Sequence, residues 1–264
     1  MSEPVVAFFD VDGTLTYRDP VTGPTDIPTP RVADAIRRFV DAGNVAVVCT
    51  GRDLGGIKNL MDSLPFAGAV TMDGARVIHD GQVVFERTMS ADAWDKTLAE
   101  IRRVHMETLV SGPYGCVIVS HDHNSPFCRL MSHLPFYEDY VAAGKPLEFC
   151  KLDFEESSLA ACQSSDFLMQ NFTYLNVADG YHELVIPGTS KGAGAHRFIE
   201  SLPFTPSCFY AFGDSENDLS ILDEADVSVV MGNASDKVKE HADFIADHVV
   251  QDGVATALER LGLI

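Results

Sequence analysis

The sequence predicts an α/β fold: a Rossmann-like core with a mostly parallel sheet flanked by helices, and an inserted α+β domain with an antiparallel sheet. Three observations predict it. Short apolar runs of strand length, such as Val5–Asp10, alternate with helical stretches near both ends of the chain, as in parallel sheets buried on both faces. Several of these runs stop at polar residues beside a Gly. The middle of the chain instead carries hairpin signals, which indicate antiparallel strands.

The composition indicates a folded chain and disfavours two classes of partner. The chain has 264 residues, of which 46% are hydrophobic, so one large domain or two with a packed core are expected. Its net charge of −20 disfavours nucleic acid and anionic membranes, which attract basic patches. Six scattered cysteines without a CxxC spacing predict reduced thiols in a cytoplasmic protein. We expect neither a signal segment nor a membrane span, because the N-terminal residues lack the basic and apolar pattern of a signal and no apolar run reaches the length of a span.

The first predicted strand ends in two carboxylates, Asp10 and Asp12, followed by Gly13 and Thr14. In open α/β sheets, the ligand site lies beyond the carboxyl ends of the strands. Two close carboxylates repel unless a cation or a shared proton relieves them, and Mg²⁺ binds oxygen ligands beside substrate phosphates. One Asp can then attack phosphorus, and the other can act as general acid and base. The alternative, a plain acidic turn, is disfavoured by the buried strand before the pair.

The N-terminal part continues the α/β pattern with a polar loop, a helix and two further strands, expected at residues 16–28, 29–43, 44–49 and 69–72. The loop is expected to hang over the end of the first strand. The second strand runs into Thr50-Gly51-Arg52. If the first two strands are parallel neighbours, the Thr50 hydroxyl lies level with Asp10, where it can hold a phosphoryl oxygen. The alternative for Thr50 is a cap of the helix that starts near Asp53.

The middle of the chain is expected to form a separate unit. Asp80-Gly81 and Asp179-Gly180 lie between apolar runs and predict two hairpins. Between the hairpins we expect a helix from Ser90, a strand at 116–120, and helices near 135–143 and 157–168. Residues 76–187 are therefore expected to be an inserted α+β domain between core segments 1–75 and 188–264. In this insertion, His121 and His123 are candidate substrate or metal contacts, and an exposed turn is the alternative.

The α/β pattern returns at Lys191, with helices and strands expected at 191–202, 209–212, 219–225, 227–231, 243–245 and 253–261. The strand at 209–212 runs into a second acidic segment that contains Asp214, Asn217 and Asp218. This segment supplies the further oxygens that Mg²⁺ needs. Lys191 is a point charge suited to a phosphoryl group, and a Lys is mildly unfavourable at a helix start, which favours a functional role over a solvated one.

Four segments, in this order, resemble the motifs of the haloacid dehalogenase superfamily: Phe9-Asp10-Val11-Asp12-Gly13-Thr14, Thr50-Gly51-Arg52, Lys191-Gly192 and Gly213-Asp214-Ser215-Glu216-Asn217-Asp218. The insertion between the second and third motifs resembles a type II (IIB) cap of the Cof-like subgroup. The resemblance covers most of the core, whereas the cap matches in pattern more than in residues.

The resemblance implies a role for each matched residue. Asp10 attacks the phosphoryl group and becomes an aspartyl-phosphate, while Asp12 protonates the leaving group and then activates water. Mg²⁺ is the implied cofactor, held by Asp10, the backbone carbonyl of Asp12 and Asp214, with Asp218 supporting it directly or through water. Contacts with the transferring phosphoryl group are implied for Thr50, Gly51, Lys191 and Asn217. Arg52 is a further candidate substrate contact.

The implied activity is hydrolysis of small phosphomonoesters, such as sugar phosphates, by a cytoplasmic monomer or homodimer. Two features depart from the family pattern: Asp73-Gly74 stands where members often carry Asn-Gly, and the loop between Thr14 and Ile27 is longer than usual. Because of these two departures, the resemblance does not determine which residues contact the substrate. The alternatives are a phosphosugar mutase with the same nucleophile, and a non-catalytic sensor of sugar phosphates.

Overall fold

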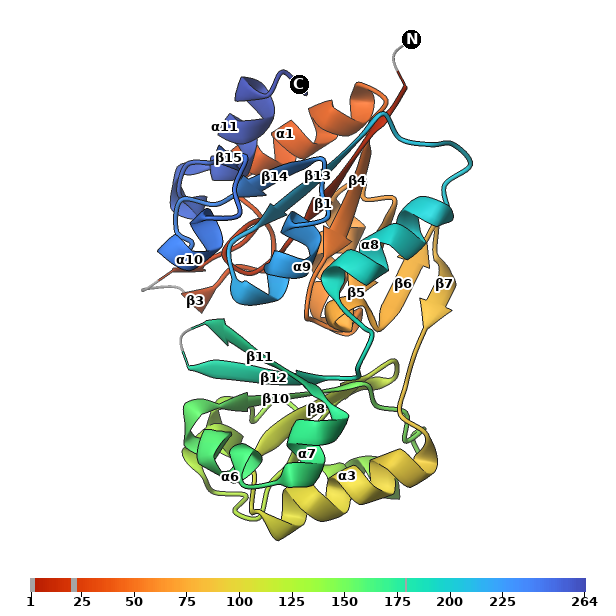
Figure 1. Ribbon diagram of the computed structural model, residues 1–264, viewed down its shortest axis with the longest axis vertical. Helices are drawn as coiled ribbons and strands as arrows, with labels where there is room; N and C mark the ends of the chain where they lie inside the picture. The colour runs from red at the N-terminus through yellow and green to blue at the C-terminus, as the bar shows by residue number, and fades with distance from the viewer. Residues whose placement is uncertain (1–2, 20–22, 179) are drawn as a thin grey trace. The chain divides into compact units, whose positions relative to one another are not determined.

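The computed structural model describes residues 3–19, 23–178 and 180–264, which form two compact units (Figure 1). The first unit contains Met1–Glu86 and Ser190–Ile264, and the second contains Arg87–Thr189. Three residues of the expected loop over the first strand, 20–22, and the expected turn residue Asp179 lie outside the described residues.

The first predicted hairpin belongs to the first unit and not to the insertion. Its strands β6 (Arg76–His79) and β7 (Gln82–Glu86) extend the large sheet, because β6 pairs antiparallel with β5 (Gly68–Thr71). Val77 of β6 is fully buried in the same apolar cluster as Val70 of β5. The expected start of the insertion at residue 76 is therefore wrong. A hairpin signal gives the direction of two strands and does not say which sheet they join.

The large sheet of the first unit has eight strands in the order β15-β14-β13-β1-β4-β5-β6-β7. All pairs from β15 to β5 are parallel, as predicted. Besides the strands given above, it contains β1 (Val5–Phe9), β4 (Val45–Cys49), β13 (Cys208–Gly213), β14 (Val227–Val230) and β15 (Phe244–Ile245). A separate small ribbon pairs β2 (Arg18–Asp19) with β3 (Gly23–Pro24).

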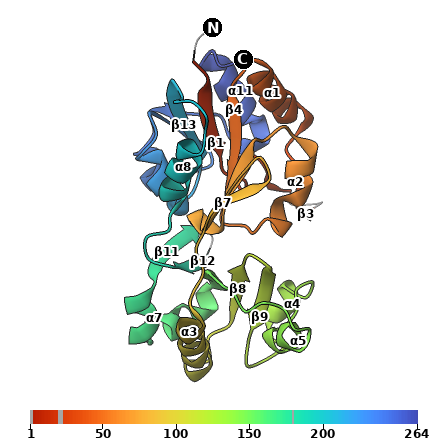
Figure 2. The ribbon, with the colours of Figure 1, turned by 90° about the vertical axis from the view of Figure 1, so that its right-hand side faces the viewer.

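Helices cover both faces of this sheet because β1 is apolar on both sides. Ala7 and Phe9 pack in one cluster with α1 (Pro30–Asp41), α2 (Lys58–Ser63) and α11 (Gly253–Arg260). Val6 and Phe8 pack in another with α8 (Lys191–Glu200) and α9 (Leu219–Leu222). Figure 2 shows α1 and α2 on one side of the sheet and α8 on the other. The short helices of this unit are η1 (Gly55–Ile57), η2 (Met72–Gly74), η4 (Glu216–Asp218), α10 (Asp236–Lys239) and η5 (Val249–Gln251).

The second unit is an antiparallel sheet with helices packed on it. Its strands, in the order β11-β12-β10-β8-β9, are β11 (Thr173–Ala178), β12 (Tyr181–Val185), β10 (Lys151–Glu155), β8 (Thr108–Gly112) and β9 (Gly115–Val119). Its helices are α3 (Ala91–Arg103), α4 (Pro126–Leu130), α5 (Tyr137–Ala142), η3 (Glu156–Ser158), α6 (Leu159–Gln163) and α7 (Asp166–Asn171).

The prediction missed parts of this second unit. Strand β10 alternates polar and apolar residues, with Leu152 and Phe154 buried in the core formed with the helices. Such a half-buried strand lacks the continuous apolar run that marks the strands of the first unit. Strand β8 was missed as well. The single helix expected at 157–168 is divided into η3, α6 and α7.

The strand order of the large sheet reverses beside β1. The chain proceeds from β1 to β4 and β5 in one direction, and later from β13 to β14 and β15 in the other. Ligand sites of open α/β sheets lie at such a reversal, beyond the carboxyl ends of the strands. Among the described residues, no helix is both long and apolar enough to cross a bilayer.

Candidate active site

Asp10 follows the central strand β1 directly, and its carboxylate is buried. Its backbone N–H donates to Phe212 O of β13 at 2.9 Å, which places it between the two central parallel strands. Lys191 Nζ donates to Asp10 Oδ1 at 2.7 Å, and the Lys191 and Asp10 side chains are only 1% and 6% exposed. The buried ion pair thus joins the first strand end to the first turn of α8.

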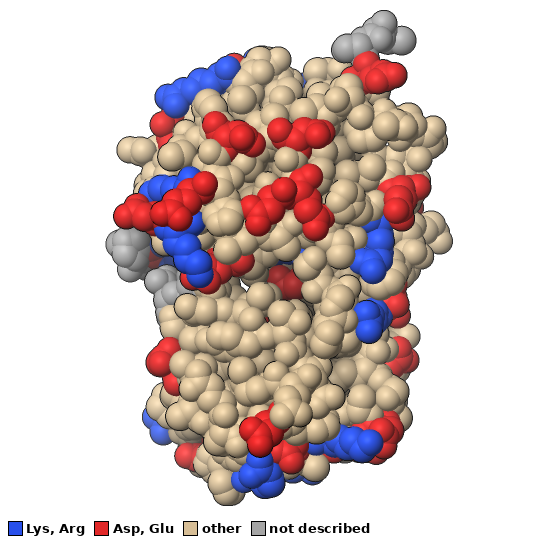
Figure 3. All heavy atoms as spheres, in the orientation of Figure 1, with Lys and Arg blue, Asp and Glu red and all other residues tan. Residues whose placement is uncertain are grey.

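Lys191 is the first residue of α8, and the Ser190 side chain caps that helix. Its ammonium also donates to Asp218 Oδ1 at 2.6 Å and to Asn217 Oδ1 at 3.2 Å. Burial disfavours the charge, but Asp10 and Asp218 outweigh it and raise the pKa of Lys191 well above its ordinary value. These contacts favour the charged form of the Lys191 ammonium. Figure 3 shows several acidic side chains, in red, on the face of the first unit that carries α9.

Three carboxylates converge at this point: Asp10, Asp214 and Asp218 each offer an oxygen, and the three oxygens lie within 4.8 Å of one another. Burial, and then the charge of Asp218, raise the pKa of Asp214 to about 7. The same two causes raise the pKa of Asp10, although Lys191 opposes them. One ammonium does not balance three carboxylates. The cluster of oxygen donors with surplus negative charge therefore suits a hard divalent cation such as Mg²⁺.

Asp218 organises the loop that carries Asp214. Its Oδ2 accepts the backbone N–H groups of Asp214 at 2.9 Å and Ser215 at 3.0 Å, while its other oxygen accepts from Lys191. Asn217 Oδ1 accepts from the Ser215 hydroxyl at 2.7 Å, and its Nδ2 donates to Asp73 Oδ1 at 3.3 Å. Asp73 thereby fixes which side of the Asn217 amide faces Lys191.

The opposite side of Asp214 contacts the turn that follows Asp12. Thr14 Oγ1 donates to Asp214 Oδ1 at 3.4 Å, and Asn233 Nδ2 donates to Asp214 Oδ2 at 3.1 Å. The same Asn233 amide donates to Gly13 O at 2.8 Å. Neither Asn233 nor Asp73 was predicted as a site residue. Asn233 follows β14, so its place after a parallel strand was the available signal.

Thr50 follows β4, the neighbour of β1, and its side chain is buried. Its Oγ1 accepts the backbone N–H of Arg52 at 3.1 Å, which leaves the hydroxyl hydrogen for another acceptor. The Arg52 guanidinium binds Asp12 with two nitrogens. Of the predicted residues, those on the first unit thus gather at the ends of β1, β4 and β13 and at the start of α8.

Comparison with known protein families shows to which family the chain belongs. The haloacid dehalogenase-like hydrolase family matches residues 7–258, which is nearly the whole chain.

The chain belongs to this family of hydrolases.

This finding confirms the family predicted from the four motifs. The chain is 30% identical to YkrA of Bacillus subtilis, named as a candidate phosphatase, with 97% of both chains covered. It is 26% identical to the 5-amino-6-(5-phospho-D-ribitylamino)uracil phosphatase YcsE of the same organism, with 95% of this chain and 93% of that one covered. The fold of this hydrolase matches BT4131, a subclass IIB sugar phosphatase of the superfamily, with a TM-score of 0.78, 19% identity and 99% and 100% of the two chains covered.

The two predicted histidines lie on the second unit of this hydrolase. His121 is exposed and contacts the His105 ring at 5.1 Å between centroids, and His123 stacks on Phe136 at 3.8 Å. All four residues belong to the second unit. A contact of His121 or His123 with substrate stays a prediction.

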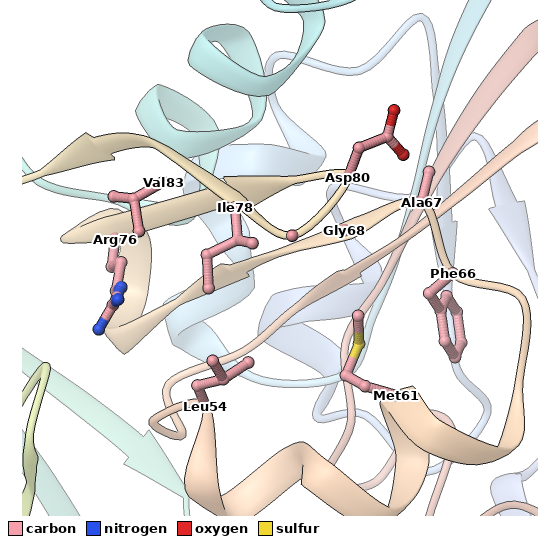
Figure 4. Close-up of a pocket in the computed structure, with 10 residues that line it drawn as sticks. Leu54, Met61, Phe66, Ala67, Gly68, Arg76, Ile78, Asp80 and Val83 are labelled. Carbon is pink, nitrogen blue, oxygen red and sulfur yellow. The ribbon is translucent and has the colours of Figure 1, made fainter.

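A hollow of about 410 Å³ also lies on the first unit of this hydrolase, and it is distinct from the acidic cluster (Figure 4). In Figure 4, Leu54 and Met61 from the α2 region face Ile78 and Val83 of the β6–β7 hairpin. None of the predicted site residues lines it. The hollow lacks the convergent polar groups of the strand ends, so the chemistry is assigned to the latter.

Proposed function

We propose that the protein is a Mg²⁺-dependent phosphatase that hydrolyses small phosphomonoesters through an aspartyl-phosphate on Asp10. The observation that supports this best is the contact of Asp10 with Lys191 inside the cluster of Asp10, Asp214 and Asp218. It provides a buried nucleophile, a fixed cation for the phosphoryl oxygens, and oxygen ligands for a metal. Phosphoryl transfer depends mainly on such positioning and charge stabilisation.

The metal ligands proposed are the carboxylates of Asp10 and Asp214, with the backbone carbonyl of Asp12. Asp218 is proposed to support these ligands directly or through water, since its oxygens already accept hydrogen bonds from Lys191 and from two backbone N–H groups. When bound, Mg²⁺ neutralises charge on the carboxylates and on the phosphoryl oxygens. The raised pKa of Asp214, about 7 without a metal, supports the need for a cation at this place.

The residues of the chain carry out two displacements. In the first, an oxygen of Asp10 bonds to phosphorus, the bond between phosphorus and the ester oxygen breaks, and Asp12 donates a proton to the departing oxygen. In the second, Asp12 takes a proton from water while the water oxygen bonds to phosphorus, and the Asp10–phosphorus bond breaks. Lys191, the Thr50 hydroxyl and backbone N–H groups after Thr50, including that of Gly51, stabilise the phosphoryl oxygens, together with the amide of Asn217.

The proposed substrates are sugar phosphates or similar metabolites. Two of the similar proteins support this class: one is named a sugar phosphatase, and the other acts on a phosphorylated ribityl compound. Both substrates named are phosphate esters of small polyhydroxylated compounds. The net charge of −20 does not oppose an anionic substrate, since Lys191 and a bound cation reverse the local field.

A panel of phosphate esters tests the proposal. We expect phosphate release from small sugar phosphates with Mg²⁺, loss of this release after exhaustive chelation, and recovery on adding Mg²⁺ back. Asp10→Asn is expected to release none. A phosphomutase would need a bisphosphate activator and would return the phosphoryl group to a sugar, and a sensor would bind the esters without turnover. Either result would contradict the proposal.

A further inference from the structure

Arg52, which follows β4, and Asp12, which follows β1, form an ion pair with two contacts. Arg52 Nε donates to Asp12 Oδ2 at 2.8 Å, and Arg52 Nη2 donates to Asp12 Oδ1 at 2.5 Å. Each carboxylate oxygen therefore has its own donor. This fork-to-fork geometry fixes both the distance and the plane of a carboxylate, which a single contact does not.

Asp12 differs from the other acidic residues of the site in how it is held. Asp10 and Asp218 are buried and Asp214 is partly buried, and each makes contacts with at least one further site residue. The Asp12 side chain is 62% exposed. Among the described residues, Arg52 is the side chain that binds its carboxylate. Without that partner, the exposed carboxylate would sample several rotamers.

Arg52 is itself held in place by its own loop. Its backbone N–H donates to Thr50 Oγ1 at 3.1 Å, and its carbonyl accepts from the backbone N–H of Met72 at 3.0 Å. Its third guanidinium nitrogen, Nη1, donates to Gly56 O at 3.1 Å. Burial opposes its charge, but the hydrogen bonds to Asp12 still raise the pKa of Arg52. The guanidinium is thus anchored at one end to the backbone and holds Asp12 at the other.

We propose that Arg52 is a positioning residue for Asp12 and not a substrate contact: its two-point pair holds the carboxylate in the orientation from which Asp12 transfers protons. This inference rests on the proposed function, because Arg52 would affect the reaction only through Asp12, the proposed acid and base. A catalytic group needs an orientation fixed by neighbours, and a rigid arginine provides it for an exposed carboxylate.

A double-mutant cycle of Arg52→Ala, Asp12→Ala and the combined variant tests this inference through kcat/KM with Mg²⁺. The substrates are phenyl phosphate and p-nitrophenyl phosphate, because phenolate is the more basic leaving group and needs the proton of Asp12 more. Acid catalysis contributes about 10²–10⁴-fold. We expect Arg52→Ala to lower kcat/KM about 10-fold or more for phenyl phosphate and much less for p-nitrophenyl phosphate. In the Asp12→Ala background, the same substitution should change kcat/KM by less than about 3-fold.

Two further variants separate positioning from charge and folding. Arg52→Lys keeps the charge but lacks the fork, so we expect it to resemble Arg52→Ala in its preference between the two esters. Arg37→Ala removes a surface arginine whose contact is a single carbonyl, Ser63 O, and should leave kcat/KM and its leaving-group dependence unchanged. Thermal melts of all variants check that they are folded.

The outcomes are distinguishable. If Arg52→Ala lowered kcat/KM equally in the wild-type and Asp12→Ala backgrounds, the inference would be overturned and Arg52 would be a substrate contact, while the proposed function would stand. No loss on Arg52→Ala would overturn it as well. If Asp12→Ala kept full activity toward both esters, the proposed acid and base would be wrong, and the inference would fail with it.

Discussion

The carboxylate of Asp214 lies directly against the backbone of Gly13. A Cβ atom placed on Gly13 would come within 2.2 Å of Asp214 Oδ2, and Gly13 has a φ of +86°. The turn after Asp12 and the acidic end of β13 therefore approach as closely as they do only because residue 13 has no side chain. This contact joins the two acidic strand ends that form the proposed metal site.

Gly13→Ala is expected to destabilise the protein and to displace Asp214. The left-handed backbone alone costs roughly 1–2 kcal/mol for Ala, and the clash with the carboxylate adds to it. Gly43→Ala is the matched control, since Gly43 has a φ of +90° but a Cβ there meets nothing within 4 Å. Urea unfolding should show a loss of stability in both variants. Phosphate release should fall only in Gly13→Ala, and equal activity in the two folded variants would contradict this reading.

Metal binding is expected to strengthen as the pH rises through about 7. Burial and the charge of Asp218 raise the pKa of Asp214 to about 7 in the metal-free folded chain, against about 4 for an exposed Asp. Between these values the folded state binds more protons than the unfolded state, so the metal-free stability falls with rising pH. A bound cation replaces the proton. The gain in Tm on adding Mg²⁺ should therefore increase from pH 5 to pH 8, and a gain that is independent of pH would count against this account.

Asn233→Ala is expected to weaken Mg²⁺ binding. The Asn233 amide donates to Asp214 Oδ2 and Gly13 O, and its Oδ1 accepts the backbone N–H of Val249 at 2.9 Å. Removal of the Asn233 amide leaves these groups without that hydrogen-bond partner, and the free-energy cost is roughly 1–3 kcal/mol. Asn44→Ala serves as control, because among the residues that the structure describes the Asn44 side chain accepts from Val5 N alone, at the other end of β1. Calorimetric titration with Mg²⁺ should show weaker binding in Asn233→Ala alone; unchanged affinity would exclude the role.

Asp73 is expected to act through its oxygen and not through its charge. It accepts from Asn217 Nδ2 at 3.3 Å and has a φ of +51°, which Asn tolerates better than most residues do. Asp73→Asn keeps an oxygen acceptor and should retain activity within about 3-fold, whereas Asp73→Ala frees the Asn217 amide and strains the backbone. Steady-state phosphate release compares the two variants. A large loss in Asp73→Asn would show that the charge matters.

Much of the first unit could be predicted from the sequence because its strands are buried on both faces. Val5–Asp10 and residues 44–49 read as continuous apolar runs, and the residues that follow them gather at one sheet edge. The fold then brings Asp10, after β1, and Lys191, at the start of α8, into contact, although 181 positions separate them.

The other parts of the fold and of the site depend on contacts between distant segments, which local sequence patterns do not show. The β6–β7 hairpin joined the large sheet because Val77 packs beside Val70, which is a tertiary contact. Strand β10 escaped detection because only Leu152 and Phe154 face the core. The roles of Asn233 and Asp73 rest on side-chain hydrogen bonds across distant segments. The sequence indicated Arg52 as a substrate contact, and only its geometry revealed the pair with Asp12.

In the proposed mechanism, Asp10 carries the phosphoryl group during turnover. The most direct measurement is an acid quench of the Mg²⁺-loaded enzyme during hydrolysis of p-nitrophenyl phosphate, followed by mass spectrometry of the peptide that contains Asp10. We expect a phosphate on Asp10 that appears within the first turnovers, is absent without Mg²⁺, and is absent in Asp10→Asn. Phosphate release by a wild-type enzyme that never carries this adduct, or near wild-type release by Asp10→Asn, would contradict it.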